Sequence, residues 1–476
     1  MLPLFILVPL FCLILLNVPP KAIVKRPAFW LVAALPLVQV FLTAFHPVAV
    51  WDEIRNPFNS YFIFNLSVDA LSTVLLLSIG IVVFIAALVG RYTLSGETQR
   101  FNFFNLLLVA FLGMNATVMV QDIFALYVFI EVTAVASFIL IAMQKDKPAL
   151  EGAFKYIILS VVATVLMLSS IALIVMAAGD TSFAAVSSAI RAYPASVLVK
   201  VAVNLFLCGL FIKAGIVPFH GWLPDAYSAA PSSVSVLLAG IITKVSGVYV
   251  LIRMVVTVFG IEQSPQAVLM FVGALSIVAG ALAAIGQSDF KRMLAYSSVS
   301  QVGYIILGLG CGTPLALAGA VFHLFNHALF KTLLFVNAAA VQEKLGTVDM
   351  NKMSGLSVKM PVTGATSVVA LLSTAGIPPL SGFWSKLIIA MALWQSGQYA
   401  YTIIAVLASV LTLAYFLSMQ RRVFFGKLQE GLENLTEARL GLILPAIILA
   451  VVTVGVGLAF PIVLDKLILP VQNILK

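Results

Sequence analysis

The sequence predicts an all-α membrane protein with about fourteen transmembrane helices. Of the 476 residues, 62% are hydrophobic and only 9% are charged, and the mean hydropathy is +1.13. A soluble domain carries about 25% charged residues, so this chain cannot cover itself with a water-facing surface. One crossing of the hydrocarbon needs roughly 20 apolar residues, which leaves room for about fourteen crossings.

Fourteen apolar runs follow one another along the chain, separated by short connections. They cover residues 2–18, 27–46, 63–92, 102–121, 123–144, 151–178, 196–228, 232–256, 264–286, 290–310, 315–343, 360–395, 399–425 and 437–465. The first run has no charged segment before it and no small-residue cleavage site before Pro19. We therefore expect a retained helix at this end rather than a signal peptide.

The basic residues favour one set of alternate loops. Sixteen lysines and arginines fall in the set that includes Lys145, Lys147, Arg421 and Arg422, whereas six fall in the other set together with the C-terminal tail. Basic residues accumulate on the cytoplasmic side of membrane proteins, so both termini are predicted to lie outside the cytoplasm. This asymmetry explains the net charge of +9 without nucleic-acid binding.

The other five lysines lie inside apolar runs, where a charge is costly. They are Lys155, Lys213, Lys244, Lys331 and Lys386, and the acids Glu131 and Asp69 also fall within runs. A charge at the bilayer centre costs roughly 2.5–3.5 kcal/mol. Helices that only anchored the protein would not contain several such charges. Lys155 lies near a helix end, where it could instead extend to the headgroups. The others lie deeper, and they predict a polar or hydrated interior.

An internal repeat places a lysine beside a helix break in each half of the chain. Residues 213–222 read KAGIVPFHGW and residues 375–386 read AGIPPLSGFWSK. Proline removes a backbone donor and clashes with the preceding turn, so both helices are expected to break within the membrane. Unwound backbone at that depth persists only where protein or water satisfies it.

Two fainter echoes extend the repeat. Residues 121–124 resemble residues 287–290, and residues 153–155 resemble residues 329–331. The offsets correspond to five helices, an odd number that reverses direction, so we predict two inverted five-helix repeats, as in transporters that work at the membrane midplane. The predicted divisions are N-terminal helices at 1–101, a first repeat at 102–256, a second repeat at 264–425, and the last helix with a short tail at 437–476.

A polar stripe on one helix face is the third signal. His323, His327 and Lys331 recur every four residues and therefore lie on one face of a helix. Two histidines at this spacing are also half of a zinc site, but the glutamate of HExxH and a cluster of further ligands are missing. We favour a hydrogen-bonded relay. His220, in the first broken helix, is a candidate for capping the break.

Nucleotide and redox motifs are not found in the sequence. It contains no P-loop, no strand-borne GxGxxG and no CxxC, and its three cysteines lie far apart in apolar runs. We therefore expect no cofactor and no metal.

Further motifs accompany the buried charges and carry a family resemblance. They are residues 129–131 (FIE), 213–226 (KAGIVPFHGWLPDA), 230–235 (APSSVS), 289–298 (DFKRMLAYSS), 323–331 and 376–386. Over roughly residues 69–426 the chain resembles the antiporter-like subunits of respiratory complex I and their relatives in Mrp cation/proton antiporters and membrane-bound hydrogenases. The HWLPD-like stretch, residues 220–225, is specific to this resemblance.

The resemblance implies roles for individual residues in proton translocation. Glu131 on the fifth helix and Lys213 on the seventh would form a switchable pair, because a buried lysine keeps its proton more readily when a carboxylate is close. Lys244 would connect the two halves, and Lys386 would stand at the exit. Some family members have histidine at the position of Lys244, and one branch has glutamate at that of Lys386. The stripe of residues 323–331 would lie between them, with Lys155, His220 and Asp69 as accessory candidates.

The expected function is that of a proton-translocating subunit of a redox-driven complex, in a prokaryotic cytoplasmic membrane. The chain would not be catalytic alone. Its partners would be homologous antiporter-like subunits, small membrane subunits and a redox module on other chains, with the lipid bilayer around them. Two alternatives remain open: a subunit of an Mrp-type Na⁺/H⁺ antiporter, and a structural scaffold whose buried charges only hold helices together.

Overall fold

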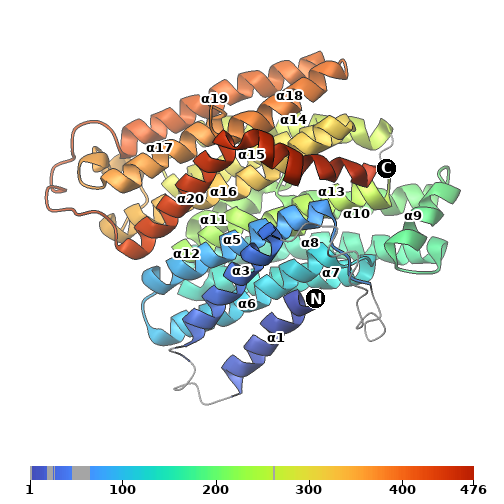
Figure 1. Ribbon diagram of the computed structural model, residues 1–476, viewed down its shortest axis with the longest axis horizontal. Coiled ribbons are helices and arrows are strands. Elements are labelled where there is room, and N and C mark those ends of the chain that lie inside the picture. Colours follow the sequence, from blue (N-terminus) through green and yellow to red (C-terminus); the bar gives the residue numbers. More distant parts are fainter. Residues whose placement is uncertain (1–2, 19–24, 26, 46–64, 261–262, 476) are drawn as a thin grey trace.

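The computed structural model describes residues 3–18, 25, 27–45, 65–260 and 263–475. Within these ranges the chain forms helices joined by short connections, with three isolated β-bridges and no strand. Twelve of the described helices are long and apolar enough to cross a membrane. Figure 1 shows the helices running alongside one another as one bundle. The prediction of an all-α membrane protein is confirmed.

The helices follow the predicted apolar runs. They are α1 (Leu4–Asn17), α3 (Ala28–Phe45), α5 (Ala70–Thr93), α6 (Glu97–Met119), α7 (Ile123–Ile141), α8 (Lys147–Ala178), α10 (Val197–Ala214) with α11 (Trp222–Ala229), the helix Ser232–Val258, α14 (Gln263–Ile285), α15 (Phe290–Cys311), α16 (Pro314–Leu345), α17 (Pro361–Ala375) with α18 (Ser381–Gln395), α19 (Tyr399–Val423) and α20 (Leu440–Leu458). A short helix, α9 (Phe183–Ala192), lies between α8 and α10 and has no counterpart among the predicted runs.

Both predicted helix breaks are present, and they share their construction. The first break follows α10 with Gly215 at φ 65° and a cis peptide bond between Val217 and Pro218. The second follows α17 with Gly376 at φ 85° and a cis bond between Pro378 and Pro379. These features recur at one offset, since 376 − 215 = 161 and 378 − 217 = 161. Glycine is needed at both positions because side chains disfavour positive φ.

The helices α8 and α16 also correspond in position. Each has 32 residues, and their starts and ends give one offset, since 314 − 147 = 167 and 345 − 178 = 167. The backbone N–H of Ile123 donates to Thr181 and that of Phe290 to Val348, again 167 residues apart at both ends. These matches support a repeat. The inversion of the two halves and the predicted division of the chain stay predictions.

This register corrects one of the two fainter echoes. The pairing of residues 153–155 with 329–331 implies an offset of 331 − 155 = 176, nine residues away from the offset of 167 between the helices that carry them. Lys155 therefore corresponds to Phe322, and Lys331 to Thr164. A match of three residues is too short to fix the register of two helices.

The helix Ser232–Val258 is unusually wound. It contains three stretches of π-helix, at Leu238–Ile242, Lys244–Tyr249 and Met254–Val258. Wider turns of this kind are often found at functional sites. The helix packs closely on the end of α10: a Cβ added to Gly247 would lie 2.4 Å from the Cα of Ala214, the neighbour of Lys213. The glycine thus brings the Lys244 segment up to the first break.

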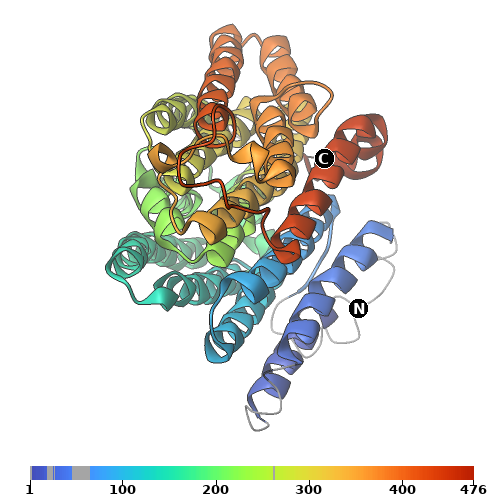
Figure 2. The same cartoon turned by 90° about the vertical axis from the view of Figure 1, so that its left-hand side faces the viewer.

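The bundle is centred on α16. Its residues 316–341 are all buried, and it packs against α5, α12 (Ser232–Leu237), α15, α17, α18 and α20. Figure 2 shows the N-terminal helices α1 and α3 at one edge of the bundle and α19 at the opposite edge. The polar stripe on α16 therefore lies in the protein interior.

Candidate functional site

An ion pair occupies the first helix break. The Nζ of Lys213, at the end of α10, lies 2.8 Å from Oε1 of Glu131 on α7. The Lys213 side chain is only 1% exposed and that of Glu131 is 24% exposed. Two hydroxyls of α8 complete the pair: Ser160 accepts a hydrogen bond from Lys213 at 2.6 Å, and Thr164 donates to Glu131 at 2.8 Å. The predicted partners are brought together.

The break itself is held by side chains on both sides. The indole N–H of Trp222 donates to the carbonyl of Ile212 at 3.1 Å, and its ring stacks on Tyr156 of α8 with centroids 4.1 Å apart. The backbone N–H of Val217 donates to Ser276 of α14 at 3.1 Å. The last of these contacts belongs to the second repeat. The unwound segment is thus fixed by both halves of the chain.

Lys155 belongs to a second ion cluster, away from the first. Its Nζ lies 2.7 Å from Glu151 and 2.7 Å from Asp225 of α11, and Arg292 of α15 also pairs with Asp225. The Lys155 side chain is 43% exposed and that of Arg292 is 37% exposed, so water screens these pairs. The sequence interpretation assigned no role to Asp225 or Arg292, although both lie in quoted motifs, because residues 67 apart give no sign of contact.

Lys244 is fully buried in the centre of the molecule. Its side chain lies on the π-helical segment and donates to the carbonyl of Ala239, with Thr243 Oγ1 3.4 Å away. Thr243 is in turn within hydrogen-bond distance of Tyr227, with 2.8 Å between the hydroxyls. No carboxylate among the described residues forms an ion pair with Lys244. The segment between the two halves therefore carries a lysine surrounded by neutral polar groups.

The stripe on α16 has the predicted geometry. The rings of His323 and His327 are nearly parallel, with centroids 6.4 Å apart. His323 Nδ1 lies 2.9 Å from the hydroxyl of Ser385 on α18. At the other end, Lys331 donates to the carbonyl of Leu294 at 3.0 Å and to the hydroxyl of Ser297, both on α15. One face of α16 therefore joins α15 to α18 with polar groups.

Lys386 ends this series of buried groups. It is 7% exposed, and its Nζ lies 4.4 Å from the centroid of the Tyr304 ring, an attraction worth about 2 kcal/mol when desolvated. The Tyr304 ring is also 5.6 Å from that of His323. The His323 ring in turn lies 6.4 Å from that of His327, which is one helical turn from Lys331 on α16. The predicted residues of the second half are thus gathered in one place.

Residues 120–412, more than half of the chain, match the protein family described as "NADH:quinone oxidoreductase/Mrp antiporter, TM". The chain belongs to this family. The match includes the breaks, both ion clusters and the stripe on α16. The resemblance drawn from the sequence motifs is therefore confirmed.

The chain is similar to subunits of several different membrane complexes. A subunit of the Na(+)/H(+) antiporter of Alkalihalophilus pseudofirmus is 31% identical over 393 residues, 82% of this chain and 79% of the relative. NADH-quinone oxidoreductase subunit N of Desulforudis audaxviator is 37% identical over 338 residues, 70% and 67% of the two chains. A chain in the structure of the membrane-bound sulfane sulfur reductase, an archaeal respiratory membrane complex, matches with a TM-score of 0.88 and 27% identity over 100% of this chain and 98% of that one.

The family and the fold together define the kind of protein. This chain is an antiporter-like integral membrane subunit, and it works among other membrane subunits, as its relatives do in multi-subunit complexes. A prokaryotic cytoplasmic membrane fits the organisms of these relatives.

Several buried polar atoms of this protein have no hydrogen-bond partner among the described residues. They include His323 Nε2, both ring nitrogens of His327, both amide atoms of Gln301, Nζ of Lys386, the hydroxyl of Tyr415 and Nδ1 of His220. Buried polar groups without partners are costly and rare in proteins, and ordered water commonly satisfies them. Apart from Nδ1 of His220, these atoms lie on α15, α16, α18 and α19, which indicates a hydrated interior. Nδ1 of His220, in the first break, likewise needs a hydrogen-bond partner; the ring centroid of His220 lies 6.3 Å from that of Tyr296.

Asp69 has a structural partner that the sequence did not predict. It caps α5 and holds the buried Arg253 with both oxygens, at 2.5 and 2.8 Å. Burial alone would raise the pKa of Asp69, but the charge and hydrogen bonds of Arg253 outweigh it and hold that pKa below its ordinary value. The charge pattern of the sequence assigns Arg253 to a loop, and likewise Lys291, which is also buried and donates to the carbonyl of Ala230 at 2.8 Å.

Proposed function

We propose that this protein translocates protons along a path from the Glu131–Lys213 pair through Lys244 and the stripe of residues 323–331 to Lys386. The observation that carries the proposal is the 2.8 Å ion pair at the first helix break, beside an unwound junction. A scaffold would have no use for lysines that lack carboxylate partners. Separating such a buried pair leaves an uncompensated charge on Lys213, which favours loss of its proton.

The ion pair works as a switch in this proposal. When Glu131 lies against Lys213, the lysine holds its proton, because the carboxylate compensates for the loss of water around the ammonium. When the two separate, Lys213 releases the proton toward Lys244, which lies on the helix that Gly247 brings against the end of α10. Glu131 is the more exposed partner and is therefore the one that moves.

The remainder of the path relies on internal water. Lys331, His327 and His323 present donors and acceptors on one face of α16, and several of their atoms have no partner among the described residues. Water between them would allow a proton to pass from one group to the next. Lys386 then receives the proton next to the second break and releases it on the opposite side of the membrane from the first.

We further propose that electron transfer on other chains drives the movement. Identity to the quinone oxidoreductase relative is 37%, and the reductase complex offers a second respiratory comparison. Moving one charge against 100 mV needs about 2.3 kcal/mol, and this chain shows no means of supplying it. The 31% identity to the antiporter relative over 82% of the chain keeps an Mrp-type Na⁺/H⁺ exchanger as the alternative.

The orientation we propose places both termini outside the cytoplasm. The basic residues of the Lys145 loop support it, because that loop then faces the cytoplasm. Lys145 and Arg191 are both exposed; Lys145 precedes α8, and Arg191 lies near the end of α9, which follows α8. A membrane-impermeant thiol reagent is expected to modify Lys145→Cys only from the cytoplasmic side and Arg191→Cys only from the other. The reverse pattern would refute this orientation.

The central test is proton uptake into vesicles that contain the assembled complex. We expect Glu131→Gln and Lys213→Ala each to lower the rate at least tenfold, because each removes one half of the switch. Lys200→Ala is the control, since this exposed lysine lies on the same helix as Lys213 and takes no part in the pair. Wild-type rates in assembled Glu131→Gln and Lys213→Ala complexes would refute the proposal.

The driving force is tested with the same vesicles. Uptake that starts on adding an electron donor and acceptor, with no sodium gradient, supports the redox-driven complex. Uptake that needs only an imposed sodium gradient supports the Mrp alternative. The two outcomes exclude one another because the energy source differs.

A further inference from the structure

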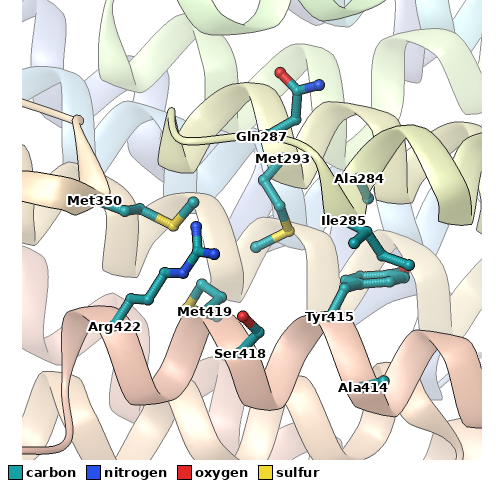
Figure 3. A pocket seen from close by; sticks show the side chains of 10 residues that line it. All are labelled: Ala284, Ile285, Gln287, Met293, Met350, Ala414, Tyr415, Ser418, Met419 and Arg422. Atoms are coloured by element: carbon teal, nitrogen blue, oxygen red, sulfur yellow. The ribbon is translucent and has the colours of Figure 1, made fainter.

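A small pocket, about 120 Å³ in volume, opens where α14, α15 and α19 meet. Figure 3 shows Met293 and Met419 facing one another across it, with Arg422 extending toward Met350 at one end and Tyr415 beside Ile285 at the other. Gln287, in the connection between α14 and α15, also lines it. Arg422 and the neighbouring loops belong to the basic set, so this end of the bundle is the predicted cytoplasmic one.

Buried polar groups lead from this pocket toward Lys331. Tyr415 is 3% exposed, and its hydroxyl has no hydrogen-bond partner among the described residues. The next residue on α19, Phe416, has its ring centroid 5.7 Å from the Nζ of Lys331. Both amide atoms of Gln301 also lack a partner among the described residues. Ser297 accepts a hydrogen bond from the Nζ of Lys331. Between the pocket and Lys331 there are thus three polar side chains, two of which need further partners that water can supply.

The corresponding place in the first repeat is filled. The helix Ser232–Val258 begins 399 − 232 = 167 residues before α19, and Tyr249 lies 415 − 249 = 166 residues before Tyr415, so the two tyrosines are within one residue of the same register. Its hydroxyl donates to the carbonyl of Val118 at 2.7 Å and accepts from Arg253 at 3.2 Å. Arg253 is held by Asp69, which caps a helix outside both repeats. The hydroxyl of Tyr249 is therefore bonded to an arginine held in an ion pair, whereas Tyr415 borders a pocket.

We propose that this pocket is a separate access route by which protons reach Lys331 without passing the Glu131–Lys213 pair. The inference rests on the proposed function, because it gives the second repeat its own supply of protons. Each water or hydroxyl along the route accepts one proton and donates one, and the transfer ends on the neutral amine of Lys331. Tyr415 stands between the pocket and this amine and positions the water that links them.

The first test measures whether the pocket holds water, independently of proton transport. In assembled complexes with Cys208→Ser, a small water-soluble thiol reagent is applied to Met293→Cys, which faces the pocket, and to Leu417→Cys, which is 48% exposed on the outer face of α19. We expect Met293→Cys to react at least tenfold faster than Leu417→Cys, and only from the side on which the pocket opens. Equal rates, or reaction from the opposite side, would overturn the inference.

The second test measures proton uptake with the pocket filled. We expect Ser418→Trp, in the pocket, to lower uptake at least twofold, and Leu417→Trp, on the neighbouring outer face, to leave it unchanged. If the tryptophan prevents assembly, Tyr415→Phe, which removes only the hydroxyl, is used in its place. We expect it also to lower proton uptake. Normal uptake in both pocket variants, with reduced uptake in Lys213→Ala, would overturn this inference alone. Normal uptake in Lys213→Ala as well would overturn the proposed function with it.

Discussion

Two buried lysines, Lys213 and Lys331, have different surroundings in the two repeats. The offset of 167 places Lys331 where the first repeat has Thr164, and it places Ser298 where the first repeat has Glu131. The first repeat thus pairs its lysine with an acid, whereas the second bonds its lysine to the hydroxyl of Ser297 and a carbonyl. A carboxylate therefore faces Lys213 in one half, and neutral dipoles face Lys331 in the other.

At the same scale, the hydroxyl of Ser160 orients Lys213. We expect Ser160→Ala to lower proton uptake about tenfold or more, because the variant keeps both charges but loses a hydrogen bond to a charged group, worth about 1.5–3 kcal/mol. Uptake is measured in vesicles with the assembled complex. Ser170→Ala is the matched control, since Ser170 lies on the same helix and bonds only the carbonyl of Ala202. Equal rates for the two variants would show that Ser160 does not act on the pair.

The buried residues show where the sequence was informative. Lysines and an acid within apolar runs stand out because their cost is high, and Glu131, Lys213, Lys244, Lys331 and Lys386 were found that way. Ser160, Thr164 and Ser297 were not found, because hydroxyls are common in membrane helices and only the fold shows which ones face a charge. Arg253 was placed in a loop because it lies near the end of its apolar run.

At the scale of helices, proline and glycine predicted the two breaks because their backbone effects are local. The π-helical turns around Lys244 were not predicted, since no residue type specifies them. Their position depends on packing: Gly247 allows the helix to approach Ala214 closely. The register of α8 against α16 was also beyond the sequence, because it depends on where the two helices begin and end.

The close packing at Gly247 gives a prediction for this helix. We expect Gly247→Ala to lower the thermal stability of the complex and to slow proton uptake, because the added methyl group would overlap the backbone of Ala214, and such overpacking costs roughly 1–3 kcal/mol. Gly455→Ala in α20 is the control, since a Cβ there would meet no atom within 4 Å. The prediction would be contradicted if Gly247→Ala had the same thermal stability and the same rate of proton uptake as Gly455→Ala.

At the scale of the molecule, two charge clusters connect its parts. Asp225 pairs with Lys155 of the first repeat and Arg292 of the second, and Asp69 of the N-terminal helices pairs with Arg253 of the first repeat. The family could be read from the sequence, because the motifs are specific. These connections could not, because each joins residues far apart along the chain.

The pair of Asp69 and Arg253 predicts a dependence of stability on pH. An acid whose pKa is lowered in the folded state stabilises the fold above its unfolded pKa of about 3.9 and loses that contribution as the pH falls through the folded value. We expect Asp69→Asn to lower the melting temperature at pH 7, and the difference from the wild type to shrink below about pH 4. Glu430→Gln, at an exposed site, is expected to have the melting temperature of the wild type at every pH tested. A constant difference down to pH 3 would contradict the role assigned to the pair.

The complete burial of α16 also bears on how the chain is made. α15 and α16 are the two least apolar of the twelve candidate spans, and 89% and 100% of their apolar windows are covered by protein. Left alone in lipid during synthesis, α16 would expose two histidines and a lysine to hydrocarbon. We expect that α16 leaves the insertion machinery only when α5, α12 and α15 are in place to pack against it. The centre of the bundle would then form after the helices that precede α16 have assembled. The helix that carries His323, His327 and Lys331 would then also set the order in which the bundle is assembled.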